Sequence, residues 1–124
     1  MRFEGWRLLV IEDDPDGREV LIRIFRHYNI WVNVVKTAEE ALEALRQDAY
    51  TAIVIDLALP GMDGWTFLSR LRAMHVLTPC FAITAYHSSD VAVKAIRSGF
   101  IGYMPKPIEA GAFVRELERV LAPT

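Results

Sequence analysis

The chain has 124 residues, 52% of them hydrophobic, which suits one domain with a sizeable core and excludes a disordered segment. Its formal net charge of -2 argues against a nucleic-acid-binding face, and no apolar run approaches the roughly 18 residues that a membrane span needs. The charged N-terminus lacks the apolar stretch of a signal peptide and Cys80 is the only cysteine, so we expect one cytoplasmic domain over residues 1–124.

Short apolar runs of strand length alternate with amphipathic segments of helical length. After the first run come Asp14 and Pro15, a favoured helix N-cap and a favoured first helical residue. After the second come Thr37 and Glu40, which form a capping box. The predicted strands, in chain order, are residues 7–11, 30–35, 51–55, 80–83 and 101–104.

The three later helices also have recognisable limits. Residues 64–75 carry apolar side chains on one helical stripe. Ser88 or Ser89 caps the fourth helix, and Gly99 ends it at a position that favours a left-handed residue. The last helix covers about residues 109–122.

The strand composition predicts the architecture. Residues 7–11, 51–55 and 80–83 are apolar throughout, as in strands covered on both faces, whereas Asn33 indicates an edge position for the second strand. Right-handed crossovers then give an α/β fold, a doubly wound parallel sheet with helices on both faces. Ligands of such sheets bind outside the carboxyl ends of the strands.

Acidic side chains follow two of the strands. Glu12 and Asp13 follow the first, and Asp56 follows the third directly after buried residues. If these strands are neighbours, the carboxylates converge, and a like-charged pair about 4 Å apart costs roughly 4 kcal/mol at an effective dielectric of about 20. Mg²⁺ would offset that repulsion. Taken alone, the acids after the first strand are explained equally well as helix-capping residues, and Asp14 is only a cap.

The last two strands bring a hydroxyl and an ammonium to the same edge. Thr84 follows the fourth strand, and Lys106 follows the fifth, before Pro107, which can form a cis bond. Each alone is unremarkable, since Thr is a good strand former and Lys is usually a solvated charge. Together with the acids they suit a phosphoryl group held beside a metal ion.

Four segments in order resemble the receiver domain of two-component response regulators: LLVIEDDP (8–15), IVIDLALPGMDG (53–64), AITA (82–85) and GYMPKP (102–107). The resemblance spans about residues 7–121 and implies a (βα)5 flavodoxin-like fold with strand order 2-1-3-4-5. It implies that Asp56 accepts a phosphoryl group from a sensor histidine kinase or phosphotransfer protein. The domain would then catalyse only its own phosphorylation and slow dephosphorylation, and would not be an enzyme otherwise.

The resemblance also assigns the metal ligands. Asp13, Asp56 and the backbone carbonyl of Ala58 would bind Mg²⁺ directly, and Glu12 would act through a coordinated water. Lys106 would meet the charge of the phosphoryl group.

Switching is implied in the same way. Thr84 would hydrogen-bond the phosphoryl group and draw its loop inward, and Tyr103 would turn from exposed to buried. The fourth helix, fifth strand and fifth helix would then present a changed surface to a downstream protein target. Because Ala58 and Tyr86 carry no acid or amide to orient water, we expect a long-lived phosphoaspartate.

Other interpretations remain open. A flavin or nucleotide binder would need a phosphate-binding loop after the first strand, and the sequence has acidic residues there instead. An aspartyl phosphatase would carry a second aspartate at the position of Ala58. A phosphorylation-independent adaptor, a phosphorelay shuttle and a receiver belonging to a longer protein are alternatives. Trp65 is expected near the site. Trp6 and Trp31 would support a homodimer, although scattered exposed aromatic residues are also normal on a monomer.

Overall fold

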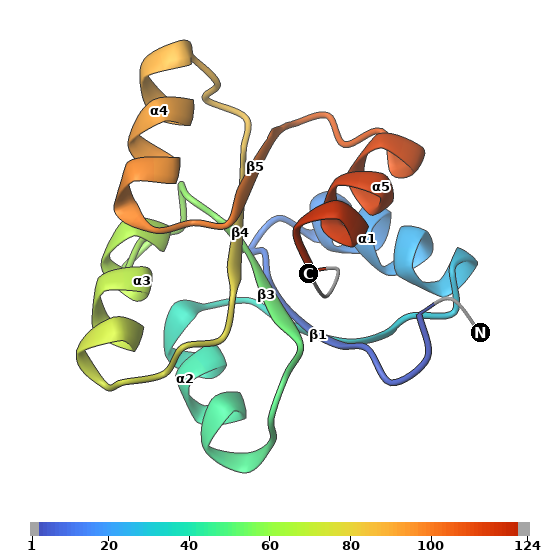
Figure 1. The fold of residues 1–124 in the computed structure, drawn as a ribbon, viewed down its shortest axis with the longest axis horizontal. Helices are drawn as coiled ribbons and strands as arrows, with labels where there is room; N and C mark the ends of the chain where they lie inside the picture. The colour runs from blue at the N-terminus through green and yellow to red at the C-terminus, as the bar shows by residue number, and fades with distance from the viewer. Residues whose placement is uncertain (1–2, 122–124) are drawn as a thin grey trace.

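The computed structural model describes residues 3–121. The described residues do not include 1–2 and 122–124. These five residues belong to the expected domain, and residue 122 was also expected to end the last helix. Strands and helices alternate along the chain as predicted (Figure 1). The strands are β1 (Arg7–Ile11), β2 (Trp31–Val35), β3 (Ala52–Asp56), β4 (Cys80–Thr84) and β5 (Gly102–Pro105). The helices are α1 (Pro15–His27), α2 (Ala38–Gln47), α3 (Gly64–Ala73), α4 (Ser89–Ser98) and α5 (Ala110–Leu121).

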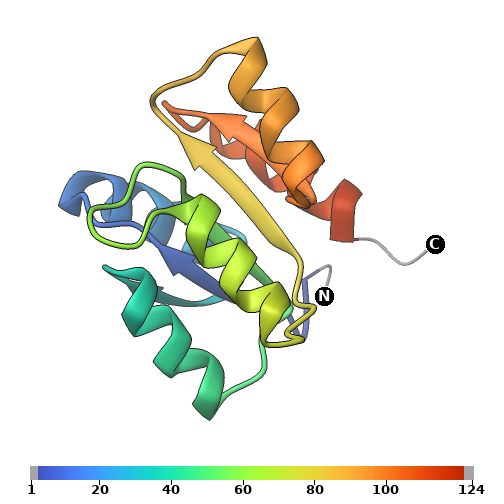
Figure 2. The ribbon, with the colours of Figure 1, turned by 90° about the vertical axis from the view of Figure 1, so that its left-hand side faces the viewer.

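The strands form one parallel sheet in the order β2-β1-β3-β4-β5, which confirms the predicted fold. All strands point the same way, with α2, α3 and α4 covering one face (Figure 2). Helices α1 and α5 cover the other face (Figure 1). The edge position of β2 is also as predicted, and the Asn33 amide there donates a hydrogen bond to the Tyr50 hydroxyl at 3.0 Å.

The sheet separates two apolar cores. In β1, Leu8 and Val10 pack towards α1 and α5, whereas Leu9 and Ile11 pack towards α2 and α3. Because successive side chains of a strand point to opposite faces, a strand covered on both faces must be apolar at every position. Cys80 belongs to the second of these cores, and burial raises the pKa of its thiol to about 11, so it behaves as a small hydrophobe.

Local side chains fix where the helices begin. Asp14 accepts a hydrogen bond from the Gly17 amide at 2.9 Å, and Ser88, not Ser89, caps α4. Asp63, which the sequence analysis missed, caps α3 by accepting from the Thr66 amide. Among residues 3–121, no helix has both the length and the apolar character needed to cross a membrane.

Candidate functional site

The carboxylates of Glu12, Asp13 and Asp56 converge at the carboxyl ends of β1 and β3. One oxygen of each lies within 4.8 Å of the others. Glu12 is fully buried and Asp56 is 6% exposed, whereas Asp13 faces the solvent. The carboxylates converge because β1 pairs directly with β3. The sequence analysis had expected this convergence if the two strands were neighbours.

Lys106 reaches the same point from the other side. Its ammonium donates one hydrogen bond to Oδ2 of Asp56 at 2.6 Å and another to Oε1 of Glu12. The Lys106 backbone amide also donates to the Thr84 carbonyl at 2.8 Å, which fixes the start of the loop after β5. The peptide bond between Lys106 and Pro107 is cis.

The buried charges perturb one another. Burial raises the pKa of Glu12, the charge of Asp56 raises it further, and the hydrogen bond from Lys106 acts in the opposite direction. For Lys106, burial lowers the pKa, but the hydrogen bonds to Asp56 and Glu12 outweigh it, so its pKa is raised. Glu12 and Lys106 therefore perturb each other through the hydrogen bond that they share. Mg²⁺ prefers oxygen ligands such as carboxylates. The three acids supply them, and Asp13 is open to solvent, so this cluster fits a magnesium ion.

The backbone after β3 holds the second oxygen of Asp56. Oδ1 accepts a hydrogen bond from the Ala58 amide at 2.9 Å, so the two carboxylate oxygens have different partners. The carbonyl of Ala58 as a metal ligand stays a prediction. Gly64 begins α3 against this segment, where a Cβ would lie 3.0 Å from the backbone of both Asp56 and Leu57. A larger residue at position 64 would require the backbone at Asp56 and Leu57 to give by a few tenths of an ångström.

Arg18 is a contributor that the sequence analysis missed. Its Nη1 donates to the carbonyl oxygen of Asp13 at 2.7 Å and to that of Glu12 at 3.3 Å. The guanidinium thereby fixes the backbone that carries both acids. An arginine on an amphipathic helix normally looks like a solvated surface charge, so no sequence signal marked it.

Thr84 lies beside the acids at the end of β4. Ile83 pairs with Asp56 across the sheet, so Thr84 extends one residue further along the same edge. Its side chain is buried, and Oγ1 accepts a hydrogen bond from the Tyr86 amide at 3.1 Å. The Tyr86 side chain itself is 73% exposed.

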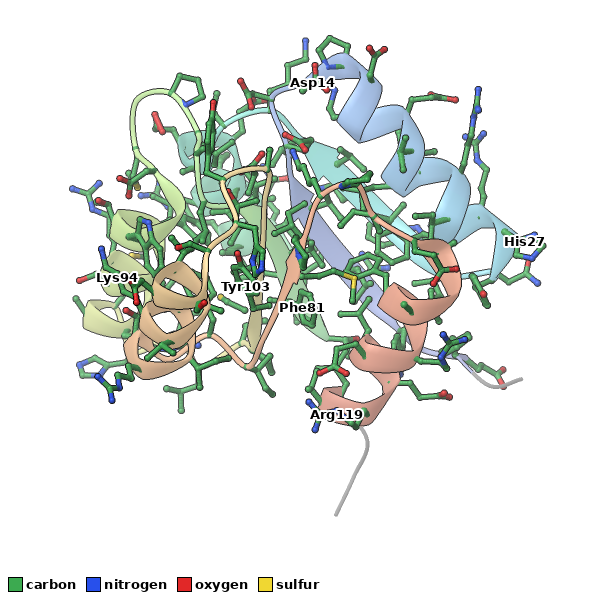
Figure 3. All side chains as sticks on the ribbon, turned by 90° about the horizontal axis from the view of Figure 1, so that it is seen from above. Asp14, His27, Phe81, Lys94, Tyr103 and Arg119 are labelled. Carbon is green, nitrogen blue, oxygen red and sulfur yellow. The ribbon has the colours of Figure 1, made fainter. Side chains whose placement is uncertain are left out.

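Tyr103 lies on the α4 side of β5 (Figure 3), where it is half-buried. Its hydroxyl shares a hydrogen bond of 2.9 Å with Nδ1 of His87, a residue that the sequence analysis did not single out. Burial raises the pKa of the Tyr103 phenol.

Trp65 was expected close to the acids, and that placement stays a prediction. The Trp65 ring contacts the Phe100 ring at a centroid distance of 5.8 Å, and the ammonium of Lys94 lies 4.4 Å from the Trp65 ring centre. Trp65 therefore reports on the contact between α3 and α4.

Comparisons with known proteins agree with the fold. The family model for the response regulator receiver domain matches residues 8–118. An uncharacterized 14.6 kDa protein in the sodA1 3' region of Leptolyngbya boryana is 33% identical over 90% of this chain and 87% of its own length. The DNA-binding transcriptional regulator NtrC of Escherichia coli (strain K12) is 31% identical over 91% of this chain, which spans only 24% of NtrC. A putative response regulator from Chloroflexus aurantiacus J-10-fl covers 97% of this chain and is itself fully covered, with 27% identity and a TM-score of 0.88.

Proposed function

This chain belongs to the response regulator receiver domain family of two-component systems, and from that premise we propose that Asp56 accepts a phosphoryl group from a phosphohistidine. The donor would be a sensor histidine kinase or a phosphotransfer protein, acting in the cytoplasm. The single observation that carries the proposal is the Asp56 carboxylate, which lies at a buried strand end between the Lys106 ammonium and the Ala58 amide.

The transfer requires little covalent chemistry from the protein. An Asp56 carboxylate oxygen forms a bond to phosphorus in line with the breaking bond between phosphorus and the histidine nitrogen. Catalysis is then mostly positioning and charge neutralisation. The Ala58 amide and the Lys106 ammonium hold the carboxylate in one orientation. Beyond its own phosphorylation and slow dephosphorylation, the domain would catalyse nothing.

Magnesium is the cofactor that fits this site. Asp13, Asp56 and the Ala58 carbonyl would hold it directly, and Glu12 would hold it through water. When bound, the ion supplies positive charge that draws the phosphoryl oxygens towards the carboxylates. The close acids favour this role, because a bound cation adds to Lys106 in offsetting their mutual repulsion.

The signal would leave through α4, β5 and α5. Thr84 donates a hydrogen bond to the phosphoryl group, its loop moves inward, and Tyr103 follows into the space. Val93 and Ile96 on α4 and Ile101 before β5 are exposed apolar side chains, which suit a surface that binds a downstream protein. Such a surface needs no nucleic acid or membrane contact. A homodimer through the exposed Trp31 and the half-buried Trp6 remains a prediction.

Labelling with phosphoramidate in the presence of Mg²⁺ tests the proposal. We expect the chain to take up one phosphoryl group and the Asp56→Asn variant to take up none. Asp14→Asn is the matched control, since it makes the same chemical change in the exposed cap nearby and should leave labelling intact. Undiminished labelling of Asp56→Asn would refute the assignment, and a phosphorylation-independent adaptor would show no labelling at all.

A further inference from the structure

His87 contacts the aromatic ring that is proposed to move during switching. Its Nδ1 lies 2.9 Å from the Tyr103 hydroxyl, and the ring centroids are 5.6 Å apart with an interplanar angle of 35°. His87 belongs to the loop between β4 and α4, and Tyr103 belongs to β5. The hydrogen bond therefore joins the loop that follows Thr84 directly to the partner-binding surface.

The loop that carries His87 is short and held at both ends. At one end the Thr84 hydroxyl accepts a hydrogen bond from the Tyr86 amide at 3.1 Å. At the other end Ser88 caps α4 by accepting from the Val91 amide at 3.1 Å. His87 lies between these two attachments, so a displacement of Thr84 towards a phosphoryl group displaces His87 as well.

We propose that His87 is a positioning residue that holds Tyr103 in its half-exposed place while Asp56 is unphosphorylated; this rests on the proposed function. The hydrogen bond exists in the resting arrangement and must break when the loop moves and Tyr103 turns inward. A contact made in only one of two states shifts their populations by its own free energy. Removing it makes the activated arrangement easier to reach.

Variants separate the hydrogen bond from the packing of the two rings. His87→Phe keeps a ring against Tyr103 and removes Nδ1. His87→Asn places an amide atom close to the position of Nδ1 and should restore part of the hydrogen bond. Tyr103→Phe removes the hydroxyl and leaves His87 in place.

The first measurement needs no phosphoryl group. In protein labelled with ¹³C-tyrosine, the four tyrosines give separate ring signals, and Tyr103→Phe identifies the signal of Tyr103. We expect His87→Phe to shift the Tyr103 signal while the signals of the distant Tyr28 and Tyr50 stay unchanged, and His87→Asn to give an intermediate position. An unchanged Tyr103 signal in His87→Phe would overturn the contact and the proposal with it.

The second measurement follows binding of beryllofluoride with Mg²⁺, a mimic of the phosphoryl group. We expect His87→Phe to lower the midpoint of the titration by roughly two- to tenfold, the effect of losing one neutral hydrogen bond. Combining it with Tyr103→Phe should lower the midpoint no further, since both changes break the same bond. An unchanged or raised midpoint in His87→Phe would contradict the role of His87 while leaving the proposed function intact. If the unaltered protein failed to bind beryllofluoride, the proposed function and the role of His87 would both be wrong.

Discussion

The Lys106 ammonium lies 2.6 Å from Oδ2 of Asp56, so a cation is in contact with the proposed nucleophile before any phosphoryl group arrives. The same ammonium also bonds the buried Glu12. Lys106 is thus the one positive side chain within a cluster of three carboxylates among the described residues.

Replacing Lys106 tests how much this cation stabilises the resting protein. We expect Lys106→Met to lower the free energy of unfolding by about 1–3 kcal/mol in buffer without Mg²⁺, because two buried carboxylates lose a charged partner. Urea unfolding measures this. Lys36→Met, at an exposed lysine, should change the value by no more than roughly 0.5 kcal/mol. Equal values for the two variants would show that Lys106 does not balance the acids.

The raised pKa of Glu12 leads us to predict that the stability of the folded protein depends on pH. Burial, and then the charge of Asp56, raise its pKa in the folded protein above the ordinary value of 4.5. The folded state therefore holds this proton more tightly, and its contribution to stability is full below pH 4.5 and is lost as pH rises through the raised pKa. Thermal unfolding without Mg²⁺ should show a smaller loss of stability over this window in Glu12→Gln than in the unaltered protein.

A control of opposite sign comes from Glu109. Hydrogen bonds from the backbone amides of Ala112 and Gly111 lower its pKa. Ionised Glu109 therefore stabilises the folded protein above pH 4.5, its ordinary pKa, and this stabilisation is lost as pH falls through the lowered pKa. Glu109→Gln should therefore differ from the unaltered protein at neutral pH and converge with it in acid. If Glu12→Gln behaved in the same way, the assigned direction for Glu12 would be wrong.

Arg18 should influence metal binding without touching the metal. We expect Arg18→Ala to weaken Mg²⁺ binding by roughly tenfold, as for other groups that orient metal ligands. Calorimetric titration measures the affinity. Arg23→Ala is the matched control, since it removes the same charge from an exposed position on α1. If charge alone mattered, both variants would bind Mg²⁺ more tightly, and the positioning role of Arg18 would be excluded.

The lifetime of the phosphoaspartate depends on whether a side chain can orient an attacking water. Ala58 offers none, so we expect phosphorylated Asp56 to persist for hours rather than seconds at neutral pH. Ala58→Asn should shorten the half-life severalfold, as followed by loss of radioactive label. The largely exposed Tyr86 ring should matter less, so Tyr86→Ala should have the smaller effect. Loss of label within seconds from the unaltered protein would contradict this expectation.

The sequence patterns were sufficient to predict the fold, because each pattern reflects either local helix capping or the burial of a strand on both faces of the sheet. Strands β1, β3 and β4 are buried at nearly every position, which requires apolar residues throughout. Boundaries were less accurate. Asp56 was expected just after the third strand but is its last residue, because the ladder continues to pair it with Ile83. Pro105 likewise falls within β5, where an edge strand tolerates a missing amide.

The site was predictable only in part. Parallel strand ends meet at one edge, so the acids, Thr84 and Lys106 were expected together, and the structure brings them together. The contacts of Arg18 and His87 depend on helix rotation and loop course, which no short pattern encodes. The contact of Lys94 with the Trp65 ring was not predicted, for the same reason.

The most direct measurement is to locate the phosphoryl group chemically. Protein phosphorylated with phosphoramidate and Mg²⁺ is treated with borohydride, which reduces an acyl phosphate of aspartate to homoserine, and the peptides are then sequenced by mass spectrometry. We predict homoserine at residue 56 and unmodified aspartate at residues 13 and 14. Homoserine at another residue, or none at all, would contradict the proposal that Asp56 is the phosphoacceptor.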